Sequence, residues 1–247
     1  MSSQTNSAES RTTVLKRKRL VRASLAQQVA DALRDAIIRG ELKAGTRLVE
    51  MEIAAQMGTS QAPVREALQR LEQDGLVARR SRSATYVTEI SMEEMYEITL
   101  VRKVVETIAA CHTARYITPE QCDELEELVQ HMHEVASVES MPMLARYDMA
   151  FHSRIVEWSR KDILVRVWTP LKYQVMRFLV AIHPDVFSNL AEVAELHMPI
   201  IEAMRKKDPA AAMQAVEDHI MLFWNEERIT TYLNSHRELT ALTRTEG

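Results

Sequence analysis

The chain has 247 residues, of which 46% are hydrophobic and 27% are charged, and its net charge is −4. No apolar run approaches the roughly 20 residues that a membrane-spanning helix needs, and no secretory signal is present, so we expect a cytoplasmic protein without a membrane partner. Two cysteines are too few for a disulfide framework or a thiolate metal site. The length suits one large or two modest domains, each able to bury a core.

Charge is divided unevenly along the chain. Lys and Arg outnumber Asp and Glu by 15 to 10 in residues 1–90, but they are outnumbered by 25 to 16 in residues 91–247. A basic module attracts the phosphates of DNA, whereas an acidic module is repelled by them. The sequence therefore predicts a front domain that binds nucleic acid and a second domain that holds something else.

Residues 1–20 are rich in Ser, Thr and charge, and they end in a basic cluster over residues 16–19. Because the segment lacks apolar periodicity, we expect a disordered basic tail. The cluster either contacts phosphates or is simply solvated, since a charge run alone carries little specificity.

Residues 21–89 carry the pattern of a winged helix-turn-helix domain. Ser24 and Gln27 form a capping box at the start of a helix that Gly40 ends. The apolar positions of this helix recur every four residues at Leu25, Val29, Leu33 and Ile37. A short helix over 50–57 follows. Segments 76–79 and 85–88 are expected to be strands, with Arg79, Arg80 and Arg82 in or beside the turn that joins them.

A tight turn and a further helix lie between these elements. Gly58 is suited to end one helix, Ser60 to cap the next, and Pro63 to occupy the first turn of that next helix. Its expected buried stripe consists of Val64, Ala67, Leu68 and Leu71. Ser60, Gln61 and Arg65 are therefore expected on or near the exposed face.

The segment 33–87 contains a distinctive set of residues, namely Gly40, Gly45, Gly58, Pro63-Val64-Arg65-Glu66-Ala67-Leu68 and Gly75-Leu76-Val77. By these residues it resembles the DNA-binding domain of the GntR family of bacterial transcription regulators. The resemblance implies a double-stranded DNA partner, with Arg65 on bases or phosphates, Gln61 on bases and Ser60 on a phosphate. It also implies contacts to the DNA backbone and minor groove from the wing arginines Arg79, Arg80 and Arg82.

Three positions depart from the family pattern. Ala44 stands where the family usually has proline, Gln61 where an arginine commonly follows the serine, and Ala84 where the wing usually carries glycine. Arginine can fork onto guanine O6 and N7, whereas glutamine suits adenine N6 and N7. We therefore expect Gln61 to shift the base preference.

Beyond Val87 every periodic segment has the spacing of an amphipathic helix. We expect helices over 91–115, 118–136, 142–158, 163–182, 189–207 and 208–233. The first has an apolar face made of Ile98, Val101, Val105, Ile108 and Ala109. Pro170 and Pro199 fall inside two of these helices and are expected to kink them. The pattern predicts an all-helical second domain over 90–235 and a tail over 236–247.

One aspartate and three histidines of this domain suggest a metal site. Asp148 and His152 are spaced i, i+4, so both project from one helix face. His197 and His219 lie on later helices, flanked by apolar residues that turn them inward. Three imidazoles and one carboxylate can be satisfied together by a divalent metal. The alternative is a core in which the histidines only form hydrogen bonds.

The segment from Glu94 to about residue 233 resembles the FCD effector domain, and the chain is thereby similar to the FadR subfamily of GntR regulators. The family's Asp-x-x-x-His and its two later histidines are matched by Asp148, His152, His197 and His219. The resemblance implies a divalent metal; this ligand set suits Zn²⁺, with Ni²⁺ or Mn²⁺ as alternatives.

Arg102 is the candidate contact for an effector. It neighbours the apolar face of its helix, at the position where FCD proteins usually carry an arginine aimed into the cavity. A guanidinium beside a metal offers a forked donor to an organic carboxylate. The alternative is a helical i, i+4 ion pair with Glu106.

These features predict a mainly α protein, in which a winged helix-turn-helix domain with three helices and a β-hairpin wing is joined to an all-α FCD-type bundle. Because FadR-like regulators are most often repressors, we expect a ligand-responsive repressor that binds a palindromic operator as a homodimer and senses a small organic acid. No catalytic residue is assigned. Two other functions stay open: a metal-dependent hydrolase with Glu195 or Glu217 as base, and an architectural DNA-binding dimer without an effector.

Overall fold

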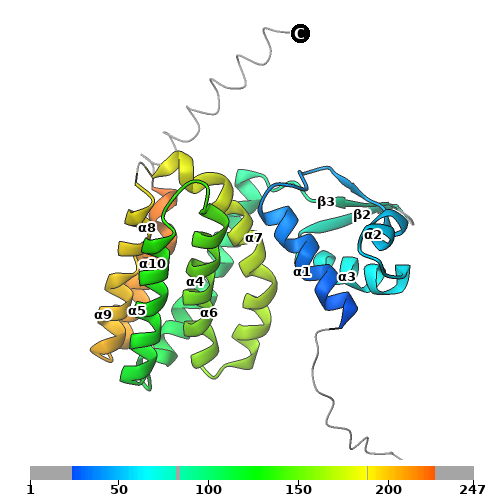
Figure 1. The fold of residues 1–247 in the computed structure, drawn as a ribbon. Helices are drawn as coiled ribbons and strands as arrows, with labels where there is room; N and C mark the ends of the chain where they lie inside the picture. The colour runs from blue at the N-terminus through cyan, green and yellow to red at the C-terminus, as the bar shows by residue number, and fades with distance from the viewer. Residues whose placement is uncertain (1–23, 82–83, 188, 226–247) are drawn as a thin grey trace, which may run out of the picture.

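The computed structural model describes residues 24–81, 84–187 and 189–225. Figure 1 shows a smaller body of helices and strands beside a larger body of helices. Four expectations lie outside the described residues: the tail over 1–20, Arg82, the end of the helix expected over 208–233, and the tail over 236–247.

The N-terminal body has the predicted winged helix-turn-helix architecture. Its helices are α1 (Leu25–Ile38), α2 (Glu50–Gln56) and α3 (Gln61–Gln73), and its strands are β1 (Arg47–Leu48), β2 (Val77–Ser81) and β3 (Ala84–Val87). The strands form an antiparallel sheet in the order β1-β3-β2. The predicted hairpin is therefore confirmed, and it gains a short third strand that the sequence pattern did not indicate.

The start of α1 follows its capping residue. The Ser24 hydroxyl accepts a hydrogen bond from the backbone N–H of Gln27 at 3.1 Å. The Gln27 side chain donates to Asp31 instead of completing the capping box. Of the apolar positions that recur every four residues, Leu25 is 58% exposed, because it occupies the first helical position, before the buried stripe begins. The core between α1 and α3 consists of Val29, Leu33, Ile37, Val64, Leu68 and Leu71.

The turn between α2 and α3 has the predicted backbone. Gly58 has φ +61, which is unfavourable for residues with a Cβ, and Pro63 lies in the first turn of α3. Ser60 occupies the N-cap position, but its side chain makes no capping hydrogen bond. Its exposed hydroxyl is therefore not committed to the helix.

The C-terminal body is helical throughout the described residues. Its elements are α4 (Met92–Ala114), α5 (Pro119–Glu134), α6 (Met141–Trp158), α7 (Asp162–Val186), α8 (Ala191–Glu195), α9 (Met198–Arg205), α10 (Pro209–Met221) and a short 3-10 turn, η1 (Leu222–Trp224). α4 is the central helix and packs against α6, α7 and α10. Phe151 and Trp168 are among the largest fully buried side chains of this core, and the Trp168 indole N–H donates to the Ser153 hydroxyl at 2.9 Å.

The single helix expected over 189–207 is wrong, because the chain forms two helices there. α8 ends at Glu195 and α9 begins at Met198, with His197 at the N-cap position between them. Pro199 therefore lies in the first turn of α9, where its missing N–H costs nothing, rather than in a helix interior. Pro170 does lie inside α7 as predicted, and α7 continues past Pro184 to Val186, beyond its expected end.

The buried face of α4 is rotated from the predicted one. Val105 and Ala109 are buried as expected, but Val101 and Ile108 are 47% and 41% exposed. The inward positions include the polar residues Arg102 and Glu106, which a search for apolar positions does not select. The outer face of α4 carries a row of exposed apolar side chains, here called the α4 outer row: Tyr96, Leu100, Val101, Val104 and Ile108.

α7 of the larger body contacts α1 of the smaller body, and Figure 1 shows α7 on the side of the larger body that faces α1. Nη2 of Arg177 on α7 donates to the backbone carbonyl of Thr88 at 2.6 Å. An ion pair between Arg146 of α6 and Asp35 of α1 adds a further contact. α7, which packs against α6, therefore also contacts the DNA-binding body.

Candidate metal centre

α6 presents two of the four predicted ligands from one face. Asp148 and His152 are separated by about one helical turn, and their residues are 3% and 0% exposed. The distance from His152 Nε2 to Asp148 Oδ1 is 3.8 Å. The i, i+4 spacing therefore places the candidate ligand atoms of Asp148 and His152 close together in the buried interior.

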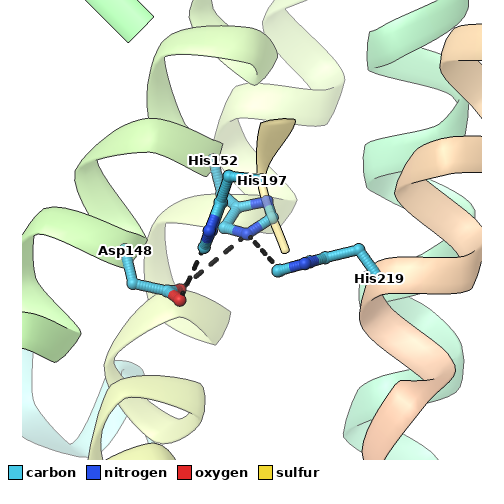
Figure 2. A group of neighbouring side chains, drawn as sticks. All are labelled: Asp148, His152, His197 and His219. Carbon is cyan, nitrogen blue, oxygen red and sulfur yellow. Dashed lines mark hydrogen bonds and ion pairs between the residues drawn. The ribbon is translucent and has the colours of Figure 1, made fainter. Parts of the chain in front are cut away.

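The other two ligands reach this point from later elements. His197, at the break between α8 and α9, places Nε2 3.5 Å from Asp148 Oδ2. His219 of α10 places Nε2 3.1 Å from His152 Nε2. Figure 2 shows the four side chains converging, with His219 approaching from the side opposite Asp148. Each offers one ligand atom, and these atoms lie within 4.8 Å of one another.

The cluster fits a divalent cation better than a core of hydrogen bonds. Asp148 Oδ1 and His197 Nε2 are buried and have no hydrogen-bond partner among the described residues. Buried polar atoms without partners are costly, and an ion at the centre would satisfy both. Ligands at about 2.1 Å around a tetrahedral ion lie roughly 3.4 Å apart, close to the separations found here. The residues that the structure brings together can therefore hold a metal.

Burial also sets the ionisation of the cluster. It lowers the pKa of His197 to about 4, and it lowers the pKa values of His152 and His219 well below their ordinary range. The imidazoles are therefore neutral at neutral pH, which is the form that binds metal ions. Burial raises the pKa of Asp148 to about 7, opposed by Arg102 and reinforced by Glu106.

Arg102 lies beside the cluster, as the sequence predicts. It also forms the i, i+4 ion pair with Glu106 that was the alternative prediction. Its Nε donates to Glu106 Oε1 at 2.6 Å, and both residues are buried. Nη2 has no hydrogen-bond partner among the described residues. With Asp148 and His219, Arg102 lines a cavity of about 50 Å³. Arg102 therefore has a donor without a partner and lines the space next to the candidate ion.

Glu106 is the site residue that the sequence reasoning did not select. It is 1% exposed, and its Oε2 lies 2.5 Å from His152 Nδ1. Burial raises the pKa of its carboxyl, with Arg102 opposing the shift. Its spacing to Arg102 was visible in the sequence, but its contact with His152 joins two helices and has no local signal.

The predicted DNA contacts lie on the other body. Ser60, Gln61, Arg65, Arg79 and Arg80 are all exposed. Gln61, Arg65 and Arg79 line one hollow of about 330 Å³ between α3 and the sheet. Arg65 forms an ion pair with Glu50, with Nη2 2.8 Å from Oε2. The structure thus brings residues of α3 and the wing residue Arg79 to one surface.

A winged helix-turn-helix joined to a separate helical domain is the architecture of a class, the DNA-binding regulators with a second, helical domain. Residues 25–87 match the model for bacterial regulatory proteins of the gntR family, and residues 94–222 match the FCD domain. The chain belongs to the GntR family. It is therefore a DNA-binding transcriptional regulator rather than an enzyme, which removes the hydrolase alternative.

Similar proteins agree with this assignment. The chain is 34% identical over 206 residues to a probable D-xylose utilization operon transcriptional repressor of Paenarthrobacter nicotinovorans, covering 83% of this chain and 90% of that one. It is 27% identical to the gluconate operon transcriptional repressor of Bacillus licheniformis, covering 81% and 84%. The solved structure of E. coli McbR/YncC aligns with a TM-score of 0.70, covering 87% and 100%; at 24% identity this supports the fold alone. In the described part of the chain no helix is both long and apolar enough to cross a bilayer.

Proposed function

We propose that this regulator is a repressor of the FadR subfamily whose helical domain senses a small organic acid at a divalent metal. The metal would be held by Asp148, His152, His197 and His219. The convergence of these four side chains on one point, three of them buried and His219 partly buried, carries the proposal. Neutral imidazoles with one carboxylate suit Zn²⁺, and Ni²⁺ or Mn²⁺ fit the same donors.

The effector would be recognised by its carboxylate. When bound, the ion supplies a positive centre for one carboxylate oxygen, and Arg102 Nη2 supplies a charge-assisted hydrogen bond to the other. The adjoining cavity, at about 50 Å³, has room for little more than a carboxylate group. A larger acid would have to displace the apolar side chains Leu196 and Leu222 that line it.

That displacement provides a physical route to regulation. A ligand changes an equilibrium only through different affinities for two arrangements of the protein. An acid that fits only after neighbouring helices move would favour an arrangement with a different placement of the DNA-binding bodies. Operator affinity would then fall when the acid binds, as a repressor requires.

Operator binding would use a homodimer in the cytoplasm. One recognition helix reads few bases, and a two-fold dimer on a palindromic operator doubles the contacts. The α4 outer row is an exposed apolar surface on the helical body, which supports α4 as the place where two copies pair. Gln61 would contact bases, Arg65 bases or phosphates and Ser60 a phosphate. The wing arginines Arg79, Arg80 and Arg82 would contact the backbone and minor groove.

The test combines metal analysis with a ligand screen. Purified protein is analysed for metal, and the zinc-loaded protein is screened by thermal shift against small acids. Acetate is included because the cavity of about 50 Å³ has room for little more than a carboxylate group, and gluconate because a relative is named for a gluconate operon. We expect bound metal and at least one acid that raises the melting temperature and weakens operator binding. Operator binding that no metal and no acid alters would favour an architectural DNA-binding dimer.

A further inference from the structure

Glu106 is a buried carboxylate that lies outside the four-residue metal cluster but contacts it. One of its oxygens, Oε1, accepts a hydrogen bond from Arg102 Nε at 2.6 Å. The other, Oε2, lies 2.5 Å from Nδ1 of His152. The carboxylate therefore bridges the candidate effector contact and one of the candidate metal ligands.

The two ring nitrogens of His152 have different surroundings. Nε2 faces the cluster, near His219 Nε2 and Asp148 Oδ1. Nδ1 lies 2.5 Å from Glu106 Oε2, and neither atom makes a hydrogen bond of good geometry to any described residue, so each is the other's nearest available partner. A neutral imidazole carries one proton and binds a metal through the nitrogen that lacks it. A carboxylate at Nδ1 favours the proton there and leaves the Nε2 lone pair for the ion.

His197 has the same arrangement with a different partner. Its Nδ1 lies 2.9 Å from the backbone carbonyl of Val193, and its Nε2 faces Asp148. A carbonyl oxygen can only accept, so Nδ1 donates and Nε2 carries the lone pair. Two of the three imidazoles thus have an acceptor at Nδ1, one from the backbone and one from Glu106.

We propose that Glu106 is a positioning residue for the metal centre. Its carboxylate accepts a hydrogen bond from Nδ1–H of His152 and thereby holds the ring with Nε2 toward the ion. The inference rests on the proposed metal binding by the cluster. Arg102 Nε holds the carboxylate in place, while Arg102 Nη2 has no hydrogen-bond partner among the described residues. A carboxylate effector on Nη2 would therefore be linked to His152 through Arg102 and Glu106.

Glu106→Gln tests this role in the full-length protein. The amide has nearly the same volume, but it cannot accept a hydrogen bond from both Arg102 and His152, because one of its two ends is a donor. Zinc affinity, measured by competition with a chromophoric chelator, should fall about 10- to 100-fold. In a His152→Ala background the same substitution should cause no further loss, because the residue that it positions is gone. Equal losses in both backgrounds, or no loss in either, overturn the proposal.

Glu106→Asp provides a second test if Glu106→Gln fails to fold. The Asp side chain keeps a charged partner for Arg102, but it is one methylene shorter and therefore places its carboxylate farther from His152. We expect intermediate zinc affinity, and visible absorption bands of the cobalt(II)-substituted protein that are shifted from wild type. Wild-type affinity together with the wild-type spectrum overturns the proposal.

Glu217→Gln is the matched control. Its carboxylate is on α10, close in sequence to His219, but pairs with Lys103 at 3.1 Å rather than with the cluster. It should keep wild-type zinc affinity; a loss equal to that of Glu106→Gln overturns the specific role of Glu106. Wild-type protein that binds neither zinc nor cobalt overturns the proposed function and this inference together, whereas tight binding by Glu106→Gln overturns the inference alone.

Discussion

The guanidinium of Arg34 on α1 lies over the ring of Tyr173 on α7, with Cζ 4.1 Å from the ring centroid. The same guanidinium donates to Asp74 Oδ2 from Nε and Nη2, so a buried cation of the DNA-binding body rests on an aromatic face of the helical body. α7 also carries Trp168, whose ring centroid is 6.5 Å from that of His152. The helix that contacts the DNA-binding body therefore also borders the candidate metal centre.

Tyr173→Ala should weaken the connection between the two bodies. A cation–π contact contributes about 0.5–2 kcal/mol, and Tyr173 also packs against both hydrophobic cores, so the free energy of unfolding should fall by at least that amount. The effect of a bound acid on operator affinity should also shrink, while metal content stays unchanged because Tyr173 lies outside the cluster. Unfolding, metal analysis and operator titrations check these outcomes. Tyr116→Ala, at a tyrosine that is 68% exposed, is the control; a full acid response in Tyr173→Ala would remove α7 from the coupling route.

Arg65→Ala should weaken operator binding without affecting the fold. Loss of a base or phosphate contact costs about 1–3 kcal/mol, which corresponds to roughly 5- to 150-fold in affinity. Thermal stability should stay near wild type, because the exposed pair with Glu50 contributes little. Fluorescence anisotropy with an operator selected in vitro measures the change. Lys206→Ala removes the same charge from a 71% exposed side chain of the helical body and should bind normally. Unchanged affinity in Arg65→Ala would exclude this contact.

The sequence predicted the parts of the fold that local signals determine. Ser24 caps α1, Gly58 makes the turn before α3, and the i, i+4 spacing brings Asp148 and His152 together. The contact between Glu106 and His152 was not predictable, because it depends on how α4 packs against α6. The same limit explains the error at Val101, since helical periodicity alone left the orientation of α4 uncertain within one turn. The break before Pro199 was missed because apolar residues continue across it.

Val104→Asp should disrupt self-association through the α4 outer row. Val104 is 55% exposed in the single chain, so a charge there costs the monomer little, but burying it in a dimer would require desolvation. Analytical ultracentrifugation should show a shift toward monomer, with weaker operator binding as a consequence. Ile163→Asp places the same charge at a 58% exposed apolar residue of α7, outside the row, and should remain dimeric. A dimer of normal strength in Val104→Asp would move the interface elsewhere.

A test of Arg102 requires a substitution that keeps a positive charge beside the Glu106 carboxylate. Arg102→Ala would leave the buried Glu106 carboxylate without its cation, at a cost of about 3–5 kcal/mol. Arg102→Lys keeps the charge and loses the fork. We expect wild-type metal content and a strongly reduced acid-induced rise in melting temperature. Lys103→Arg, at the neighbouring α4 residue that pairs with Glu217, is the control with a normal response. A full response in Arg102→Lys would place the carboxylate contact on another residue.

The metal stoichiometry of the purified wild-type protein tests the central claim most directly. Mass-spectrometric elemental analysis of the as-purified protein, and of protein reconstituted with zinc and then dialysed, should give about one divalent ion per chain, as a site with four protein ligands predicts. His197→Ala, which removes one of those ligands, should retain much less. Protein that holds no stoichiometric metal in either preparation would contradict the account, because Asp148, His152, His197 and His219 would then have to satisfy one another by hydrogen bonds alone.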